Sequence, residues 1–126
     1  MMTQTNQVRD CFSQPGEFHN HPGGISRVVV GPDVRQQSRP AALNSERLVV
    51  HTNEYEPGGT SGDGHVHADQ EQAFFILEGQ MEATVGDEVI TAEPGDLVLL
   101  PRNVWHKHRN TGDGVLKFLF LSAKLD

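Results

Sequence analysis

The chain has 126 residues, enough for one domain with its own hydrophobic core. Seventeen acidic residues against ten basic ones give a formal net charge of -7 at pH 7, which repels phosphate backbones and argues against a nucleic-acid partner. The single cysteine, Cys11, excludes an intrachain disulfide, and no apolar run approaches the roughly 20 residues of a membrane helix. No apolar signal region is present near the N-terminus, so we expect a cytoplasmic protein without a membrane partner.

The first predicted segment is an N-terminal arm, residues 1–24, which is rich in Gln, Asn, Ser, Pro and Gly and has no periodicity. His19 and His21 in this arm have the spacing of a metal-binding pair, but no third donor accompanies them, which favours an arm without a metal role. Cys11 has no base placed beside it, so an incidental thiol is favoured over a nucleophile. Residues 25–126 are predicted to form one domain.

Short strand-like runs follow one another in this domain, separated by turn residues such as Pro57-Gly58-Gly59 and Gly86-Asp87. Short strands at even spacing, without a helical period, predict an all-β antiparallel sandwich or barrel. The predicted strands are Ser26–Val30, Arg47–Tyr55, Ala73–Leu77, Gln80–Val85, Glu88–Ala92, Leu97–Leu100, Trp105–Arg109 and Val115–Leu121.

Three histidines have the pattern of a metal site. His65 and His67 are two residues apart, so along an extended segment they point to the same side, while Val66 points away. If a later antiparallel strand brings His106 to the same interior, three imidazole nitrogens converge at roughly 2 Å from an ion. Imidazole suits divalent transition metals, so the sequence predicts one such ion.

The strand that contains His106 supplies a further candidate. His106, His108 and Asn110 share one face, whereas Lys107 and Arg109 point the other way. His108 is therefore expected to face the same cavity as a catalytic general acid or base, since its pKa in model peptides is near neutral. The alternative is a histidine that only forms part of the wall. His51 is likewise interpreted as a wall residue, and Trp105 as a packing residue.

Apolar residues occupy both faces of the predicted strand Ala73–Leu77. Phe74 and Ile76 should line the barrel, and Phe75 and Leu77 should then face outward. A strand that is apolar on both faces is typical of one covered on both sides. We therefore expect a homodimer that covers the outward face.

Two segments resemble the two sequence motifs of the cupin superfamily. Gly59–Gly79 contains a glycine, five residues and the His-x-His pair, and ends in a glycine; Gly95–Asn110 contains Pro101 and His106 at the spacing of the second motif. The resemblance implies a small single-domain jelly-roll β-barrel of cupin type, often dimeric, with a metal in its mouth. It also implies His65, His67 and His106 as metal ligands.

One position departs from the motif. The carboxylate ligand is expected seven residues before Gly79, where this chain has Gln72; Glu71 lies one residue earlier and should point to the opposite face. We predict Gln72 as the fourth ligand, with a bulge that turns Glu71 inward as the alternative. A neutral amide leaves the ion its full charge, which favours Lewis-acid chemistry. Zn²⁺, Fe²⁺, Ni²⁺, Mn²⁺ and Co²⁺ all stay open.

The run Leu100–Asp113, with Gly23–Val30, is similar to small cupins that include polyketide cyclases. The leading hypothesis is a metal-dependent cupin enzyme that acts on a small oxygenated organic molecule as a cyclase, isomerase or lyase. One alternative is an iron-dependent dioxygenase, which fits a carboxylate-containing site better. Others are a non-catalytic small-molecule-binding cupin and a dimer whose metal only stabilises the barrel, because one fold hosts many functions.

Overall fold

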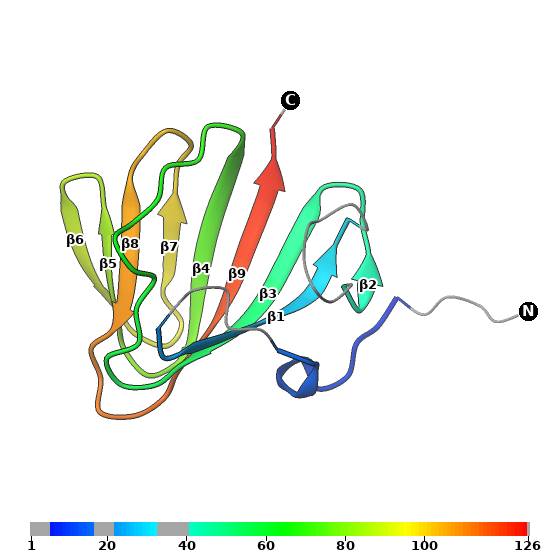
Figure 1. The fold of residues 1–126 in the computed structure, drawn as a ribbon, viewed down its shortest axis with the longest axis horizontal. Coiled ribbons are helices and arrows are strands. Elements are labelled where there is room, and N and C mark those ends of the chain that lie inside the picture. The colour runs from blue at the N-terminus through cyan, green and yellow to red at the C-terminus, as the bar shows by residue number, and fades with distance from the viewer. Residues whose placement is uncertain (1–5, 17–21, 33–40, 126) are drawn as a thin grey trace, which may run out of the picture.

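The computed structural model describes residues 6–16, 22–32 and 41–125, and these are almost entirely β-structure. The one helical element among them is a short 3-10 helix, and none of their helices is long and apolar enough to cross a membrane. The elements, in chain order, are η1 (Cys11–Ser13), β1 (Gly24–Gly31), β2 (Leu43–Asn44), β3 (Leu48–Tyr55), β4 (Gln70–Glu78), β5 (Met81–Val85), β6 (Glu88–Ala92), β7 (Leu97–Leu100), β8 (His106–Asn110) and β9 (Leu116–Lys124) (Figure 1).

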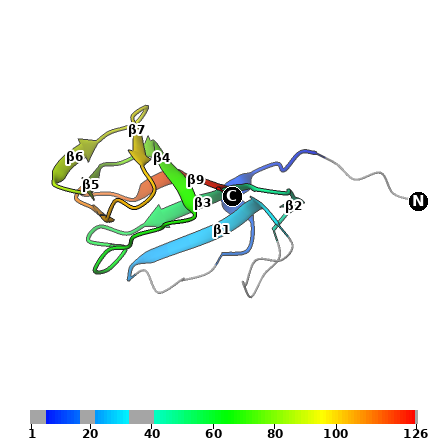
Figure 2. The same cartoon turned by 90° about the horizontal axis from the view of Figure 1, so that it is seen from above.

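The strands form two sheets. The larger sheet has the order β2-β1-β3-β9-β4-β7 and the smaller one the order β6-β5-β8. All neighbours are antiparallel except β1 and β2. The smaller sheet gathers at the β4–β7 side of the larger one, whereas β2 lies at the far end (Figures 1 and 2). The C-terminal strand β9 lies between β3 and β4, so the connections are those of a jelly roll, and the all-β prediction is confirmed.

Most observed strands differ from the predicted ones by one to three residues at an end, and two differences concern the site or the sheet order. β2 was not predicted, because its two residues pair only with Val30 and Gly31 and are too short to show alternation. β4 begins at Gln70 rather than Ala73, since its first inward residues are glutamines that face a cavity and interrupt the apolar pattern.

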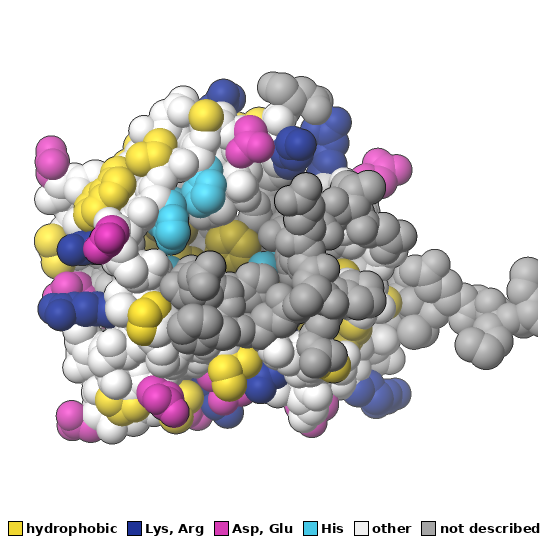
Figure 3. Space-filling view, viewed as in Figure 1, with side chains coloured by type: hydrophobic (Ala, Val, Ile, Leu, Met, Phe, Trp, Pro, Cys, Tyr) yellow, Lys and Arg dark blue, Asp and Glu magenta, His cyan; other side chains and the backbone are white. Residues whose placement is uncertain are grey.

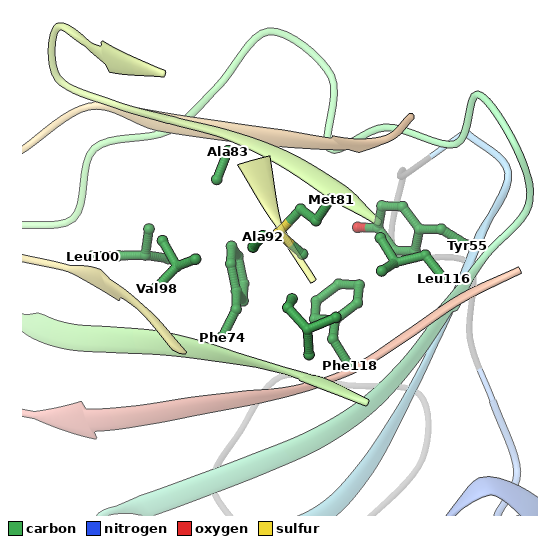
Figure 4. Packing of buried hydrophobic residues seen from close by; sticks show 10 residues of the cluster. Tyr55, Phe74, Met81, Ala83, Ala92, Val98, Leu100, Leu116 and Phe118 are labelled. Atoms are coloured by element: carbon green, nitrogen blue, oxygen red, sulfur yellow. The ribbon is translucent and has the colours of Figure 1, made fainter. Parts of the chain in front are cut away.

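The hydrophobic core fills the space between the two sheets. Its buried members come from both sheets and point toward one another (Figure 4). They are Tyr55, Phe74, Ile76, Met81, Ala83, Ala92, Val98, Leu100, Leu116 and Phe118. The histidines of the motifs lie next to this core, so its packing fixes the floor of the site.

The described part of the N-terminal arm packs on the outer face of the larger sheet. Thr52 Oγ1 donates to the Cys11 carbonyl oxygen at 3.0 Å, and Arg27 Nε donates to the Gln14 carbonyl oxygen at 2.8 Å. Thr52 is buried although it points away from the barrel interior. His19 and His21, considered above as a metal-binding pair, lie outside the described residues.

Candidate metal centre

The first-motif segment is held against β8 by its backbone. His65 N donates to the His106 carbonyl oxygen at 2.8 Å, and His106 N donates back to the His65 carbonyl oxygen at 2.9 Å. Nearby, Asn103 N donates to the His67 carbonyl oxygen at 2.7 Å, and Ser61 N donates to the carbonyl oxygen of residue 108 at 3.0 Å. The segment thus runs beside β8 like an extra strand, which brings residues from both motifs to one end of the barrel.

Gly64 makes this close approach possible. Its φ is +102°, a region that favours glycine, and a Cβ there would lie 2.5 Å from the Trp105 ring. Trp105 therefore packs on Gly64, in keeping with its predicted packing role, and is 37% exposed. Lys107 Nζ lies 5.7 Å from the centroid of the same ring.

The structure brings the three predicted histidines together. The ring centroids are 6.0 Å apart for His65 and His67, 6.1 Å for His65 and His106, and 5.5 Å for His67 and His106. Nitrogen ligands about 2.0–2.1 Å from a tetrahedral ion place ring centroids roughly 5 Å apart. The rings are thus slightly more open, and over the described residues no group of three His, Cys, Asp or Glu side chains has closed into a ligand arrangement.

The environment of His106 and His67 lowers the pKa of both imidazoles and so favours their neutral form. Burial lowers the pKa of His106; its hydrogen bond to Val104 opposes that shift, and the nearby His67 and His65 add to it. Burial and the neighbouring His65 also lower the pKa of His67, against a smaller opposing effect of Asp69. Neutral imidazole is the metal-binding form. The residues present therefore fit a divalent transition-metal ion by their donor chemistry.

A hydrogen bond also selects the tautomer of His106. Its Nδ1–H donates to the Val104 carbonyl oxygen at 3.4 Å, which leaves Nε2 with the lone pair. Such a backbone partner behind the ring is typical of metal-ligating histidines.

Gln72 faces the cavity and Glu71 does not. Gln72 is 7% exposed and lines the cavity, whereas Glu71 is exposed to solvent. The pairing of β4 with β9 is regular from Gln70 to Ile76, so the structure has no bulge that would turn Glu71 inward. The inward position of Phe74 and Ile76 is confirmed in the same register. Ligation by Gln72 stays a prediction.

The amide of Gln72 is oriented by a short hydrogen-bond chain. Gln72 Nε2 donates to Gln70 Oε1 at 3.0 Å, and Ser122 Oγ donates to the same oxygen. Because the nitrogen of the Gln72 amide is engaged by Gln70, its Oε1 is the end left for a ligand role. The sequence did not single out Gln70 or Ser122, although both share the inward parity of their strands.

A cavity of about 310 Å³ opens next to the histidines. Figure 3 shows histidine side chains beside a hollow with apolar side chains at its floor. The lining combines imidazole, hydroxyl and amide groups with aromatic rings. The lining residues are Ser26, His51, Asn53, Tyr55, His65, His67, Gln70, Gln72, Phe74, His106, His108, Phe118 and Phe120. His51 is thus a wall residue, as expected.

His108 is buried in the cavity wall among aromatic side chains. Its Nε2 shares a hydrogen bond of 3.0 Å with the Tyr55 hydroxyl, and its ring lies 4.5 Å from that of Phe74 and 5.5 Å from that of Phe118. Burial raises the pKa of Tyr55 far above its ordinary value, so it is a neutral phenol. Tyr55 was missed from the sequence, although it shares the inward parity of His51.

Asn110 faces inward, as its spacing from His108 predicted, but its contacts are structural. Its Nδ2 donates to the carbonyl oxygens of Tyr55 and Gly114, both at 2.9 Å. Its Oδ1 accepts from Gly112 N at 2.9 Å. The side chain thus ties β8 to the turn that follows it.

Comparison with known proteins identifies the family. The family model described as the cupin domain matches residues 51–122, from β3 to β9. An uncharacterised protein of Methanocaldococcus jannaschii is 33% identical over 100 residues, which cover 79% of this chain and 73% of that protein. The 1-methylthio-D-xylulose 5-phosphate methylsulfurylase of Rhodospirillum rubrum is 41% identical over 64 residues, 50% of this chain and only 39% of that enzyme.

A solved structure supports the same assignment at the level of the fold. The polyketide cyclase RemF of Streptomyces resistomycificus superposes with a TM-score of 0.70 at 22% sequence identity, over 100% of this chain and 81% of that chain. The jelly roll, the two motifs and the family match agree, and the chain belongs to the cupin family.

Proposed function

We propose that this cupin is a metal-dependent enzyme that acts on a small oxygenated organic molecule by cyclisation, isomerisation or elimination. The observation that carries the proposal is the meeting of His65, His67 and His106, with ring centroids 5.5 to 6.1 Å apart, at one wall of the cavity. A divalent transition-metal ion held there would polarise a substrate carbonyl or stabilise an enolate.

The donor set favours this chemistry over oxygen activation. Gln72 occupies the inward position at which a carboxylate would reduce the charge of the site, and Glu71 is turned away. Non-haem iron oxygenases combine histidines with a carboxylate. A neutral amide therefore supports the Lewis-acid reaction classes over the dioxygenase alternative.

His108 is the residue proposed to hold or move the proton. It shares the cavity with the three histidines, and the Tyr55 hydroxyl fixes its ring through Nε2. The rings of Phe74 and Phe118 pack against the imidazole, and His108 is 6% exposed. A proton exchanged there is thus shielded from solvent, which is the environment that general acid–base catalysis uses.

Metal analysis tests the first half of the proposal. The protein as isolated should contain about one equivalent of a divalent transition metal, and His106→Ala should lose most of it. His51→Gln is the matched control, because His51 is a buried histidine of the same cavity outside the proposed ligand set. Full metal content in His106→Ala would contradict the proposal.

Proton exchange tests the second half. A β-dicarbonyl probe in deuterated buffer, followed by NMR, should exchange its α-proton faster with the metal-loaded protein than with the metal-free one. His108→Gln should still bind the probe and lose the acceleration. Binding without exchange in the wild-type protein would instead identify a non-catalytic binding cupin.

A further inference from the structure

A second polar group lines the cavity away from the histidines of the motifs. Ser26 on β1 and His51 on β3 share a hydrogen bond of 3.1 Å between Oγ and Nδ1, and both side chains are buried. Asn53, the register partner of Ser26, is buried beside them. These three residues, the β1–β3 polar cluster, all line the cavity.

The sheet order sets the distance between this cluster and Gln72. His51 on β3 pairs with Phe120 on β9, and Phe120 pairs with Phe74 on β4. Gln72 lies two residues farther along β4, so two strand spacings and two residues of rise separate it from His51, about 12 Å. Aromatic rings cover the gap: the Phe120 ring lies 5.1 Å from that of His51 and 6.2 Å from that of Phe74. Along this wall, the cavity therefore has polar groups at both ends and aromatic rings between them.

We propose that Ser26 and His51 bind a second oxygen of the substrate, at the end of the molecule away from the metal. The ligand class is a flat, largely apolar molecule with a neutral hydroxyl or carbonyl oxygen at each end. For the metal-side oxygen this inference rests on the proposed function, whereas for the other oxygen it depends only on the β1–β3 polar cluster.

The chemistry of the pair suits such an oxygen. A serine hydroxyl rotates, and an imidazole exists in two tautomers, so together they either donate to a carbonyl or accept from a hydroxyl. The hydrogen bond between Ser26 and His51 offsets the cost of burying them, but replacing both partners of a buried hydrogen bond by apolar groups of the same shape can be nearly neutral for stability. Ligand recognition gives the pair a role that packing does not require.

The probes are 4,4′-dihydroxybiphenyl and 4-hydroxybiphenyl, which differ by one hydroxyl and whose long axis is on the scale of the cavity. Calorimetric titration of the zinc-loaded wild-type protein should give tighter binding of the diol. Ser26→Ala should weaken binding of the diol roughly three- to tenfold, because one hydrogen bond to its second hydroxyl is lost. The affinity for the mono-ol, whose single hydroxyl is at the metal, should not change. His51→Phe keeps the ring packing on Phe120 and should show the same loss of diol affinity. Ser45→Ala, at a half-buried serine outside the cavity, should change the affinity for neither probe.

The metal-free protein separates this inference from the proposed function. Without the metal, the hydroxyl of the mono-ol should bind at the β1–β3 polar cluster. Ser26→Ala should therefore weaken binding of the mono-ol to the metal-free protein as well. Equal binding of diol and mono-ol to the wild-type protein, equal loss of both in zinc-loaded Ser26→Ala, or no binding of either probe would each overturn the inference. Failure of the protein to bind zinc would overturn the proposed function. The titration of the metal-free protein with the mono-ol would still test whether Ser26 and His51 bind a hydroxyl.

Discussion

The backbones of His65 and His106 exchange two hydrogen bonds, at 2.8 and 2.9 Å, although the two residues belong to different motifs. The backbone alone therefore sets their relative position, without help from their side chains. A substitution at either imidazole should remove a donor without displacing its neighbour, so metal-binding measurements on such variants report ligation rather than unfolding.

Exchanging the residue at position 72 should tune the metal site. Gln72→Glu should retain or tighten metal binding and reduce Lewis acidity, because a carboxylate offsets about one unit of the ion's charge. Gln72→Ala should weaken binding less than His106→Ala does. Competition titration with a chelator measures each affinity, and Glu71→Ala is the control because Glu71 is exposed. Loss of metal in Glu71→Ala alone would show that Glu71 is the ligand after all.

Gly64→Ala should destabilise the protein by about 1–3 kcal/mol or more, because it adds both backbone strain and a clash. The new Cβ would lie 2.5 Å from the Trp105 ring at a φ of +102°. Gly62→Ala is the matched control: its φ is +86°, yet no atom lies within 4 Å of the added Cβ. Urea unfolding should show the larger loss for Gly64→Ala, and adding Trp105→Ala should recover part of it. An equal decrease in the free energy of unfolding for both variants would show that the contact between Gly64 and Trp105 does not contribute to stability.

Tyr55 should make stability fall at alkaline pH. Burial raises its pKa, so above about pH 10 the unfolded chain releases a proton that the folded chain retains. The unfolded state then binds fewer protons, and the free energy of unfolding decreases as pH rises; below about pH 10 this contribution is fully present. Because Tyr55 is the only tyrosine, tyrosinate absorbance reports it alone.

That absorbance should appear together with loss of the circular dichroism of the folded state, rather than before it. In Tyr55→Phe the decrease of stability above about pH 10 should be smaller. A tyrosinate signal near its ordinary pKa in the still-folded protein would show that the phenol is accessible.

The outer face of the larger sheet should form a dimer interface. Leu97 and Leu119 flank Phe75 in the strand register, and Leu97 and Leu99 are 60% and 55% exposed. Exposed apolar patches of this kind mark interaction surfaces. Sedimentation should give about twice the 13.9 kDa chain mass, and Leu99→Lys should yield monomers. Val89→Lys is the control, because Val89 is 64% exposed on the smaller sheet. A monomeric wild-type protein would contradict the expectation.

Strand parity explains what the sequence could predict. Alternation placed Gln72, Phe74 and Ile76 on the inner face of β4, and the structure confirms that face. The same rule grouped His106 with His108. Parity, however, says nothing about which residues meet across the barrel.

Two contacts that were missed from the sequence join residues on different strands. Tyr55 meets His108 from the opposite sheet, and Ser26 meets His51 from a neighbouring strand whose register a bulge shifts between Val28 and Val30. Such pairs depend on the order and register of the strands, including the position of β9 between β3 and β4, which local pattern does not reveal.

Because β9 lies between β3 and β4, the larger sheet can be completed only after β9 has been synthesised. β3 and β4 bond to each other only through β9, so a nascent chain that ends before residue 116 has two unsatisfied strand edges in the middle of its larger sheet. Exposed edges of this kind invite pairing with other chains. Contacts so distant in sequence also close slowly. The chain should therefore be prone to aggregation until β9 leaves the ribosome, and a ribosome stalled within β9 should release an aggregation-prone product.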